Sequence, residues 1–209
     1  MSFQTPANTS SQKNIGINFL KRDGVIVFPT DTVYCLACRY DNIKAVNRVY
    51  EIKQRAHNLA LPIMVADKAQ INKIVKYIPD SAQPFIAKYM PGPITLIMPK
   101  ADSVNSLITD NKDTVAVRIP KHDLTLDLIK GVGVPLVATS ANISGMPNNA
   151  DAEQVIKQIG DKVDFVLDSG ECPLGTVSTI VDVTGEIPVI LREGAISRKE
   201  LQIFYEGIK

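Results

Sequence analysis

The stretch VIVFPTDTVYCLACRY, Val25 to Tyr40, indicates how the rest of the chain is organised. It opens with a short apolar run that ends at Pro29, which is the pattern of a buried strand. Threonine, aspartate and tyrosine follow where that strand stops. In open α/β sheets the strand ends line the ligand crevice, so the pattern favours an α/β fold with a ligand site beside this strand.

Cys35 and Cys38 in the same stretch have the C-x-x-C spacing of a redox couple or of half a zinc site. A four-ligand zinc site would need nearly all of the chain's three cysteines and two histidines, and no second closely spaced ligand pair exists. A redox C-x-x-C usually opens a helix, whereas the helical pattern here starts near Asn42. The plainer interpretation is two small apolar residues in a buried turn, which suits reduced thiols.

The bulk composition is that of an ordinary globular protein. With 209 residues, 45% hydrophobic and 22% charged, the chain can bury a substantial core, most simply as one domain, although two small domains would also fit. A net charge of +1 gives no global basic field, so any RNA contact would need a local patch.

No apolar run approaches the length needed to span a bilayer, and the N-terminus lacks the features of a secretory signal. We therefore expect a cytoplasmic protein with no membrane partner. The opening segment is rich in Ser, Thr, Asn and Pro, which predicts a disordered tail over residues 1–12 before a domain over 13–209.

Helical and strand patterns recur along the chain and predict a mixed α/β domain with helical crossovers and antiparallel pairs. A helix capped by Asp41 or Asn42 should carry Lys53 and Arg55 at its end. The runs STIVDV and IPVILR flank Thr-Gly-Glu and predict a hairpin. Further helices are expected at about residues 17–24, 67–77, 81–90, 122–131 and 151–160 and from Ser197, and further strands at 25–29, 61–67, 94–99, 114–120, 134–140 and 162–168.

Cationic and hydroxyl groups recur at the predicted strand and helix ends, where they could converge on one crevice although they are far apart in sequence. Lys53 and Arg55 could hold neighbouring phosphate oxygens at a frayed helix end, although a solvated pair that offsets the helix dipole is the plainer interpretation. The recurring groups are Thr30, Thr32, Lys53, Arg55, Arg118, Ser140, Asn142, Ser178, Thr179 and Arg192.

The segment from Ser140 to Ser144 lies where a buried strand breaks into a loop. Its hydroxyl and amide groups suit a phosphate or a ribose, although ordinary turns use the same residue types. Arg118 lies between apolar neighbours and needs an anionic partner, which could be a substrate carboxylate or an internal aspartate.

Familiar nucleotide-binding signatures are missing from the sequence: there is no G-x-x-x-x-G-K-[ST], no G-x-G-x-x-G and no kinase-like set. His57 and His122 are expected on surface loops and complete no Ser-His-Asp or Cys-His arrangement. ATP binding would therefore need another architecture.

Taken in order, the blocks FPTDTVYCLACRY, YEIKQR, MPGPITLIMP, VAVRIP, TSANISG, PLGTVSTIVD and VILREGAIS resemble the motif series of the YrdC-like threonylcarbamoyl-adenylate synthases, from about residue 14 to 205. The resemblance implies a single α/β domain, with a large twisted mixed sheet flanked by helices around a deep central cavity. It implies a nucleotidyltransferase that joins L-threonine, bicarbonate or CO2, and ATP into threonylcarbamoyl-AMP and pyrophosphate for threonylcarbamoyladenosine modification of tRNA. Mg²⁺ would come with the ATP phosphates, tRNA would be an indirect partner, and transferase proteins would use the product.

The same resemblance implies a role for each matching residue. Lys53 and Arg55 match the family's K-x-R and would be the catalytic residues, contacting phosphates and the carbamate. The ATP site would consist of Lys53, Arg55, Ser140, Asn142, Ser144 and Arg192. The threonine site would consist of Thr30, Thr32, Tyr34, Arg118, Ser178 and Thr179.

The chain also departs from the family pattern. Asp31 stands where the family commonly has glutamate, Cys35 where it has glycine, and Met64 where it has a histidine. The last change puts a histidine contact to substrate in question. The chain ends soon after REGAIS, which indicates the short, single-domain form of the family.

Two other functions stay open. A YrdC-like RNA-binding or ribosome-associated protein without synthase activity would need a basic face, which the near-neutral charge disfavours. Carbamoyl-adenylate chemistry on another acceptor, as in hydrogenase maturation, is disfavoured by the short chain. The joint presence of K-x-R and S-x-N favours the synthase.

Overall fold

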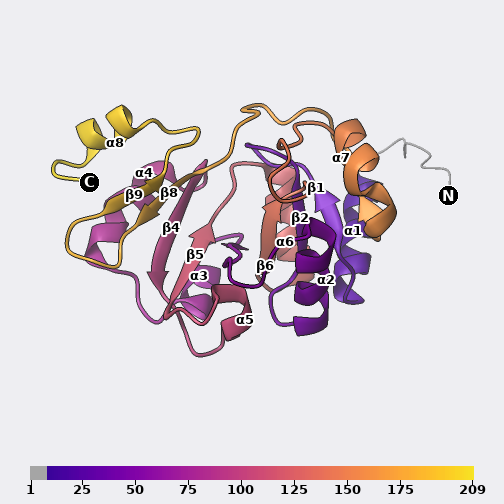
Figure 1. The fold of residues 1–209 in the computed structure, drawn as a ribbon, viewed down its shortest axis with the longest axis horizontal. Coiled ribbons are helices and arrows are strands. Elements are labelled where there is room, and N and C mark those ends of the chain that lie inside the picture. Colours follow the sequence, from indigo (N-terminus) through magenta and orange to yellow (C-terminus); the bar gives the residue numbers. More distant parts are fainter. Residues whose placement is uncertain (1–8) are drawn as a thin grey trace.

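The computed structural model describes residues 9–209 and shows helices arranged around one sheet (Figure 1). The helices are α1 (Thr9–Lys21), α2 (Ile43–Lys53), α3 (Lys68–Ile74), α4 (Gln83–Tyr89), α5 (Ser106–Thr109), α6 (Asp123–Val132), α7 (Ala152–Ile159) and α8 (Arg198–Phe204), with short 3₁₀ helices at Asp80–Ala82 and Gly160–Lys162. The strands are β1 (Ile26–Phe28), β2 (Cys35–Arg39), β3 (Ile63–Met64), β4 (Ile94–Pro99), β5 (Thr114–Arg118), β6 (Leu136–Ser140), β7 (Phe165–Val166), β8 (Thr179–Asp182) and β9 (Val189–Arg192).

The strands form one mixed sheet in the order β7-β1-β2-β6-β3-β5-β4-β8-β9. Three neighbouring pairs, β1 with β7, β3 with β5 and β4 with β8, are parallel, and the other pairs are antiparallel. The predicted mixed α/β fold is confirmed, and the predicted hairpin is β8 with β9.

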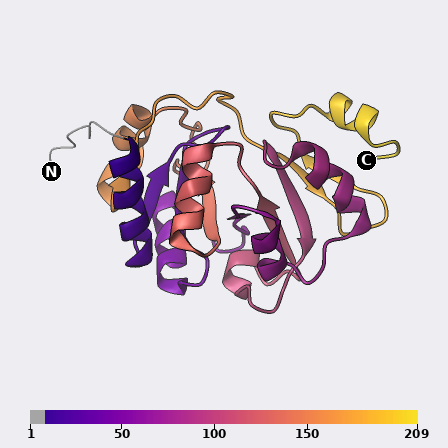
Figure 2. The ribbon, with the colours of Figure 1, turned by 180° about the vertical axis from the view of Figure 1, so that it is seen from behind.

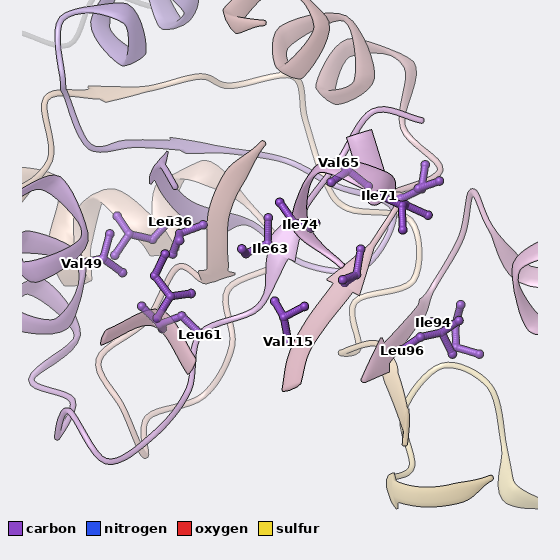
Figure 3. Close-up of a cluster of buried hydrophobic side chains, with 14 of the residues drawn as sticks. Leu36, Val49, Leu61, Ile63, Val65, Ile71, Ile74, Ile94, Leu96 and Val115 are labelled. Carbon is purple, nitrogen blue, oxygen red and sulfur yellow. The ribbon is translucent and has the colours of Figure 1, made fainter. Parts of the chain in front are cut away.

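Alternate strand residues enter two different cores because successive side chains point to opposite sheet faces. Along β2, Leu36 and Cys38 belong to a large core with α2, α3, α4 and α7, part of which is shown in Figure 3. Cys35 and Ala37 belong to a smaller core with α1 and α6, which lie side by side in Figure 2. The two faces of the sheet therefore carry separate cores, and the candidate site lies on the face that carries the smaller core.

Helix α2 positions the predicted basic pair. The Oδ1 atom of Asn42 accepts from the backbone N–H of Ala45 at 3.0 Å, which caps the first turn. The helix ends at Lys53, because Gln54 adopts a left-handed conformation with φ 49° and its N–H caps the last turn. The chain then turns, so that Lys53 and Arg55 leave the helix end in different directions.

The C-x-x-C cysteines lie in strand β2, so the buried turn predicted for them is wrong. Cys35 pairs with Phe28 of β1 on one side and with Ser140 of β6 on the other. A strand hydrogen bonded on both sides and covered on both faces shows no polar alternation, which explains why the sequence pattern did not indicate it. The three cysteines are free and buried.

Helix α1 begins inside the segment predicted to be a disordered tail. Residues 1–8 of that prediction lie outside the described residues, but residues 9–12 are helical. Gln12 is 3% exposed, and its Oε1 accepts from the backbone N–H of Asp168 at 2.8 Å. A buried polar anchor therefore orders a segment that has almost no apolar residues of its own.

Candidate active site

A pocket of about 250 Å³ lies on the sheet face that carries the smaller core. Cys35, Met64 and Ala138 belong both to that core and to the pocket wall. The floor continues along β5 and β4 through Ala116 and Ile97. The floor of the pocket is thus built on strands, and more than half of the lining residues are apolar.

Of the twelve residues predicted for the site, the structure brings six to the wall of this pocket. They come from six different segments, including the β1–β2 connection, the chain after α2, and strands β5, β6 and β9 (Figure 1). These six are Thr32, Arg55, Arg118, Ser140, Ser178 and Arg192.

The other six predicted residues are not part of the pocket wall, and most are held by hydrogen bonds within the protein. The Tyr34 hydroxyl donates to Gly170 O at 2.7 Å, and the Thr179 hydroxyl donates to Ile196 O at 2.6 Å. Ser144 is exposed on the loop after β6. Thr30 lies behind Thr32, while Lys53 and Asn142 lie behind Ser140.

Arg118 forms an ion pair with an internal aspartate, which is one of the two partners that the sequence predicted for it. Its Nη2 lies 2.6 Å from Asp31 Oδ1, and both side chains are about 5% exposed. The same guanidinium donates to Thr32 Oγ1 at 2.8 Å and to Gly92 O at 3.0 Å. This network fixes the guanidinium at the pocket wall, where a further anion can reach it.

The Thr32 hydroxyl has a defined direction. The hydroxyl of Thr30 donates to Val33 O at 2.8 Å, so in the 2.9 Å contact between the two threonine hydroxyls Thr32 is the donor. Because it also accepts from Arg118, Thr32 can offer the pocket only a lone pair.

Arg55 and Arg192 bring positive charge to the pocket. Within residues 9–209 neither guanidinium has an ion-pair partner. Arg55 donates to Ala60 O, and its buried Nε has no hydrogen-bond partner among the described residues. Burial lowers the pKa of Arg192, and the charges of Arg118 and Arg55 lower it further. Such a pocket suits an anionic ligand.

Arg192 reaches the pocket because β9 contains a bulge. Val181 of β8 pairs with Ile190, and the next residue, Ile180, pairs with Arg192 rather than Leu191. The extra residue turns Arg192 to the face occupied by Ile180, which also lines the pocket.

The Lys53 ammonium is buried directly behind Ser140. It is 2% exposed and donates to Ser140 O at 2.6 Å, Asn142 O at 2.9 Å and Asn142 Oδ1 at 3.0 Å. Burial, with the charge of Arg55 acting in the same direction, lowers its pKa to about 8. The three N–H groups of the ammonium are therefore all used inside the protein.

Residues 9–209 show neither a metal-binding cluster nor a membrane-spanning helix. This part of the chain contains no group of three or more His, Cys, Asp or Glu residues that could hold a metal ion. No helix in it is long and apolar enough to cross a membrane.

His57 is exposed and stacks on Tyr50, as expected of a surface residue. His122 is half-buried at the N-cap position just before α6, where its Nδ1 lies 3.0 Å from the Thr125 hydroxyl.

Sequence reasoning missed several pocket residues. Thr95, Ile97 and Thr139 line the pocket but had not been singled out for a role in binding. The alternation of β4 carried the available signal, because Thr95 and Ile97 point opposite to the core residue Leu96.

Comparisons with known proteins agree with the geometry. Residues 18–194 match a family model named for Sua5, YciO and YrdC and described as "Telomere recombination". The chain is 37% identical to the Threonylcarbamoyl-AMP synthase of Pyrococcus abyssi over 90% of its own length and 55% of that protein. It is 35% identical to the enzyme of the same name from Bacillus subtilis, over 88% and 53%. The chain thus spans about half the length of these two curated relatives.

A solved structure shows the same fold. The crystal structure of P. abyssi Sua5 complexed with L-threonine superposes with a TM-score of 0.92 at 35% identity, covering 98% of this chain and 60% of that one.

Proposed function

Because the chain belongs to the Sua5/YciO/YrdC family, we propose that it is an L-threonylcarbamoyladenylate synthase, a nucleotidyltransferase that forms threonylcarbamoyl-AMP and pyrophosphate from L-threonine, bicarbonate or CO2, and ATP. The names of the two curated relatives and the threonine complex of Sua5 support the reaction and one substrate.

One observation in this chain carries the proposal. Arg55, Arg118 and Arg192 line one pocket, and among the residues that the structure describes a carboxylate pairs only with Arg118. Apolar residues, Met64 and Ala116 among them, line the same pocket. A pocket that joins uncompensated guanidiniums to an apolar wall suits a small, multiply charged ligand with an aliphatic part, such as a carbamate of threonine beside a phosphate group.

The reaction asks little covalent work of the protein. The threonine amine takes up CO2, the resulting carbamate oxygen attacks the α-phosphorus, and pyrophosphate leaves. We assign Arg55 and Arg192 to the charge that builds on the phosphate oxygens, and Arg118 to the threonine carboxylate. The apolar wall would keep water from the labile carbamate, and the strand-borne side chains would hold the reactants in line.

Mg²⁺ is expected as part of the ATP substrate. The carboxylate of Asp31 contacts the pocket residue Arg118, which already occupies one of its oxygens. Among residues 9–209 the pocket lining therefore offers phosphate-binding cations and no carboxylate cluster, which fits a metal carried by phosphate oxygens.

The proposal also covers the extent of the domain, the place where the protein acts and its partners. The catalytic domain would be residues 13–209, with a deep central cavity around the pocket. The protein would act in the cytoplasm, and partner transferases would carry the threonylcarbamoyl group to tRNA, so that tRNA is an indirect partner.

The test is an assay of purified protein with ATP, Mg²⁺, bicarbonate and L-threonine. Pyrophosphate and an AMP-linked product should form only when all three substrates are present. Arg55→Ala and Arg192→Ala should each abolish or strongly reduce this turnover, while Arg22→Ala, at an exposed position on the segment after α1, should not. Normal turnover in both pocket variants would contradict the proposal.

A further inference from the structure

The hydrogen bonds around Ser140 fix the direction in which its hydroxyl can interact with a ligand. We propose that Ser140 accepts a hydrogen bond from an N–H or O–H group of the ligand, and that Lys53 and Asn142 are positioning residues that keep it an acceptor. This inference rests on the proposed function, because it names a contact within the same pocket.

The first step is the orientation of the Asn142 amide. Its Oδ1 lies 3.0 Å from Lys53 Nζ, and its Nδ2 lies 2.6 Å from Met146 O. An ammonium group can only donate and a carbonyl oxygen can only accept. Both contacts therefore require the same amide orientation, with the oxygen toward Lys53.

The second step is the direction of the Ser140 hydroxyl. Its Oγ lies 2.6 Å from the same Asn142 Oδ1. An amide oxygen carries no hydrogen, so Ser140 must donate the single hydrogen that it has. Ser140 lines the pocket, and what it can still offer a ligand there is its lone pairs.

The third step concerns the ligand. Ionised phosphate and carboxylate oxygens are acceptors only, so they gain no hydrogen bond from a hydroxyl in this state. An amine, a ribose hydroxyl or the adenine amino group can donate to it. Thr32 presents an acceptor to the same pocket, by the independent network through Thr30 and Arg118. The pocket therefore pairs guanidiniums for anionic groups with hydroxyl acceptors for donor groups.

Lys53 holds this arrangement from both its side chain and its backbone. The ammonium binds Ser140 O and Asn142 O, at 2.6 and 2.9 Å, in addition to Asn142 Oδ1. The carbonyl of Lys53 accepts from the backbone N–H of Ser144 at 2.8 Å. The loop after β6 is thus fastened to the end of α2 at the residue that orients the amide.

Calorimetric titration of the wild type and Ser140→Ala with three probes tests the inference: inorganic tripolyphosphate, ATP and L-threonine. Ser140→Ala should weaken the binding of ATP or of L-threonine by roughly three- to tenfold, which is the value of one neutral hydrogen bond. The affinity for tripolyphosphate should stay within about twofold of the wild-type value. The probe whose affinity falls identifies the hydrogen-bond donor as a group of the nucleoside or of the amino acid. Ser103→Ala is the matched control, because that hydroxyl donates to Lys73 O and is not part of the pocket wall.

Two results would overturn the inference: equal weakening of tripolyphosphate and ATP, which would make Ser140 a phosphate donor, or no change with any probe. Failure of the wild type to bind all three probes would overturn both the inference and the proposed function. A probe that depends on Ser140 in a protein without threonine-dependent turnover would leave the inference standing and remove the proposed function.

The positioning role has its own readout. Asn142→Asp keeps an oxygen for both Lys53 and Ser140, whereas Asn142→Leu removes it and frees the serine hydrogen. Adding Ser140→Ala should therefore reduce the affinity for the Ser140-dependent probe by the same factor in the Asn142→Asp background as in the wild type. In the Asn142→Leu background the reduction in affinity should be at least threefold smaller. Equal costs in both backgrounds would show that Asn142 only supports the loop.

Discussion

Replacing Lys53 with methionine tests how the buried ammonium balances stability against function. Lys53 is 2% exposed, and burial lowers its pKa from 10.5 to about 8. One pKa unit corresponds to about 1.4 kcal/mol, so holding the charged form in the folded protein at pH 7 costs on the order of 3 kcal/mol. Methionine removes the charge while filling a similar volume.

The hydrogen bonds lost in this variant offset that gain only in part. Ser140 O also accepts from the backbone N–H of Asn142 at 2.9 Å, and Asn142 Oδ1 also accepts from Ser140 Oγ at 2.6 Å. The carbonyl of Asn142 is the acceptor left without its donor, at a cost of about 1 to 3 kcal/mol. We therefore expect Lys53→Met to be between equally stable and about 2 kcal/mol more stable than the wild type at pH 7, with its turnover lost.

The pH dependence gives the sign of the effect. Below pH 8 the lysine is charged in both the folded and the unfolded protein, so the full penalty applies. Between about pH 8 and 10.5 the folded protein releases the proton while the unfolded chain keeps it. The stability of the wild type relative to Lys53→Met should therefore rise over this interval, by up to about 1.4 kcal/mol per pH unit.

Urea unfolding of the wild type and Lys53→Met at pH 7, 8, 9 and 10 measures this difference, and pyrophosphate release measures turnover. Lys100→Met is the matched control, because Lys100 is partly exposed, donates to Val104 O and is not part of the pocket wall. The reasoning fails if the difference between wild type and Lys53→Met is flat from pH 8 to 10, or if the variant is destabilised by several kcal/mol at pH 7.

Three further predictions concern the pocket and the cysteines. Asp31→Leu should lower the free energy of unfolding by about 3 to 5 kcal/mol because it leaves the Arg118 charge buried and unpaired. Adding Arg118→Met should restore most of this loss; urea midpoints that show two additive losses would contradict the pairing. Burial raises the pKa of Cys35 and Cys38 to about 12 and that of Cys172 to about 11, so iodoacetamide at pH 8 should label the three thiols much faster in urea than in the native state, as read by mass spectrometry. L-Serine should bind more weakly than L-threonine by roughly 1 to 3 kcal/mol in calorimetry, and equal affinities would show that no apolar wall contacts the methyl group.

The fold could be predicted where a strand or helix has a pattern of its own. The run from Ile26 to Phe28 is bounded by Pro29, and helix α2 shows helical spacing after its Asn42 cap, so both were placed correctly. Strand β2 was missed because it is buried on both faces and carries small residues, which leaves no alternation to detect. Its existence depends on β1 and β6, its neighbours on either side, which no local pattern shows.

The candidate site was predictable as a set of residue types but not as a layered arrangement. The K-x-R and S-x-N patterns give no reason to expect that some of their four side chains reach the ligand and others do not. In the structure Arg55 and Ser140 line the pocket, whereas Lys53 and Asn142 lie behind them. The chain direction at the end of α2 makes this difference, because the left-handed Gln54 sends the two basic side chains to different depths.

Arg192 shows why even a correct strand assignment does not settle which side chains reach a site. In a regular strand, residues two apart share a face, so Arg192 would lie on the side of Ile190 and enter the large core. One extra residue, Leu191, reverses this parity and places Arg192 opposite Ile180 at the pocket. The four-residue sequence of β9, Val-Ile-Leu-Arg, carries no mark of such a bulge. The position of this guanidinium is therefore set by the pairing of β9 with β8, a contact that exists only in the folded sheet.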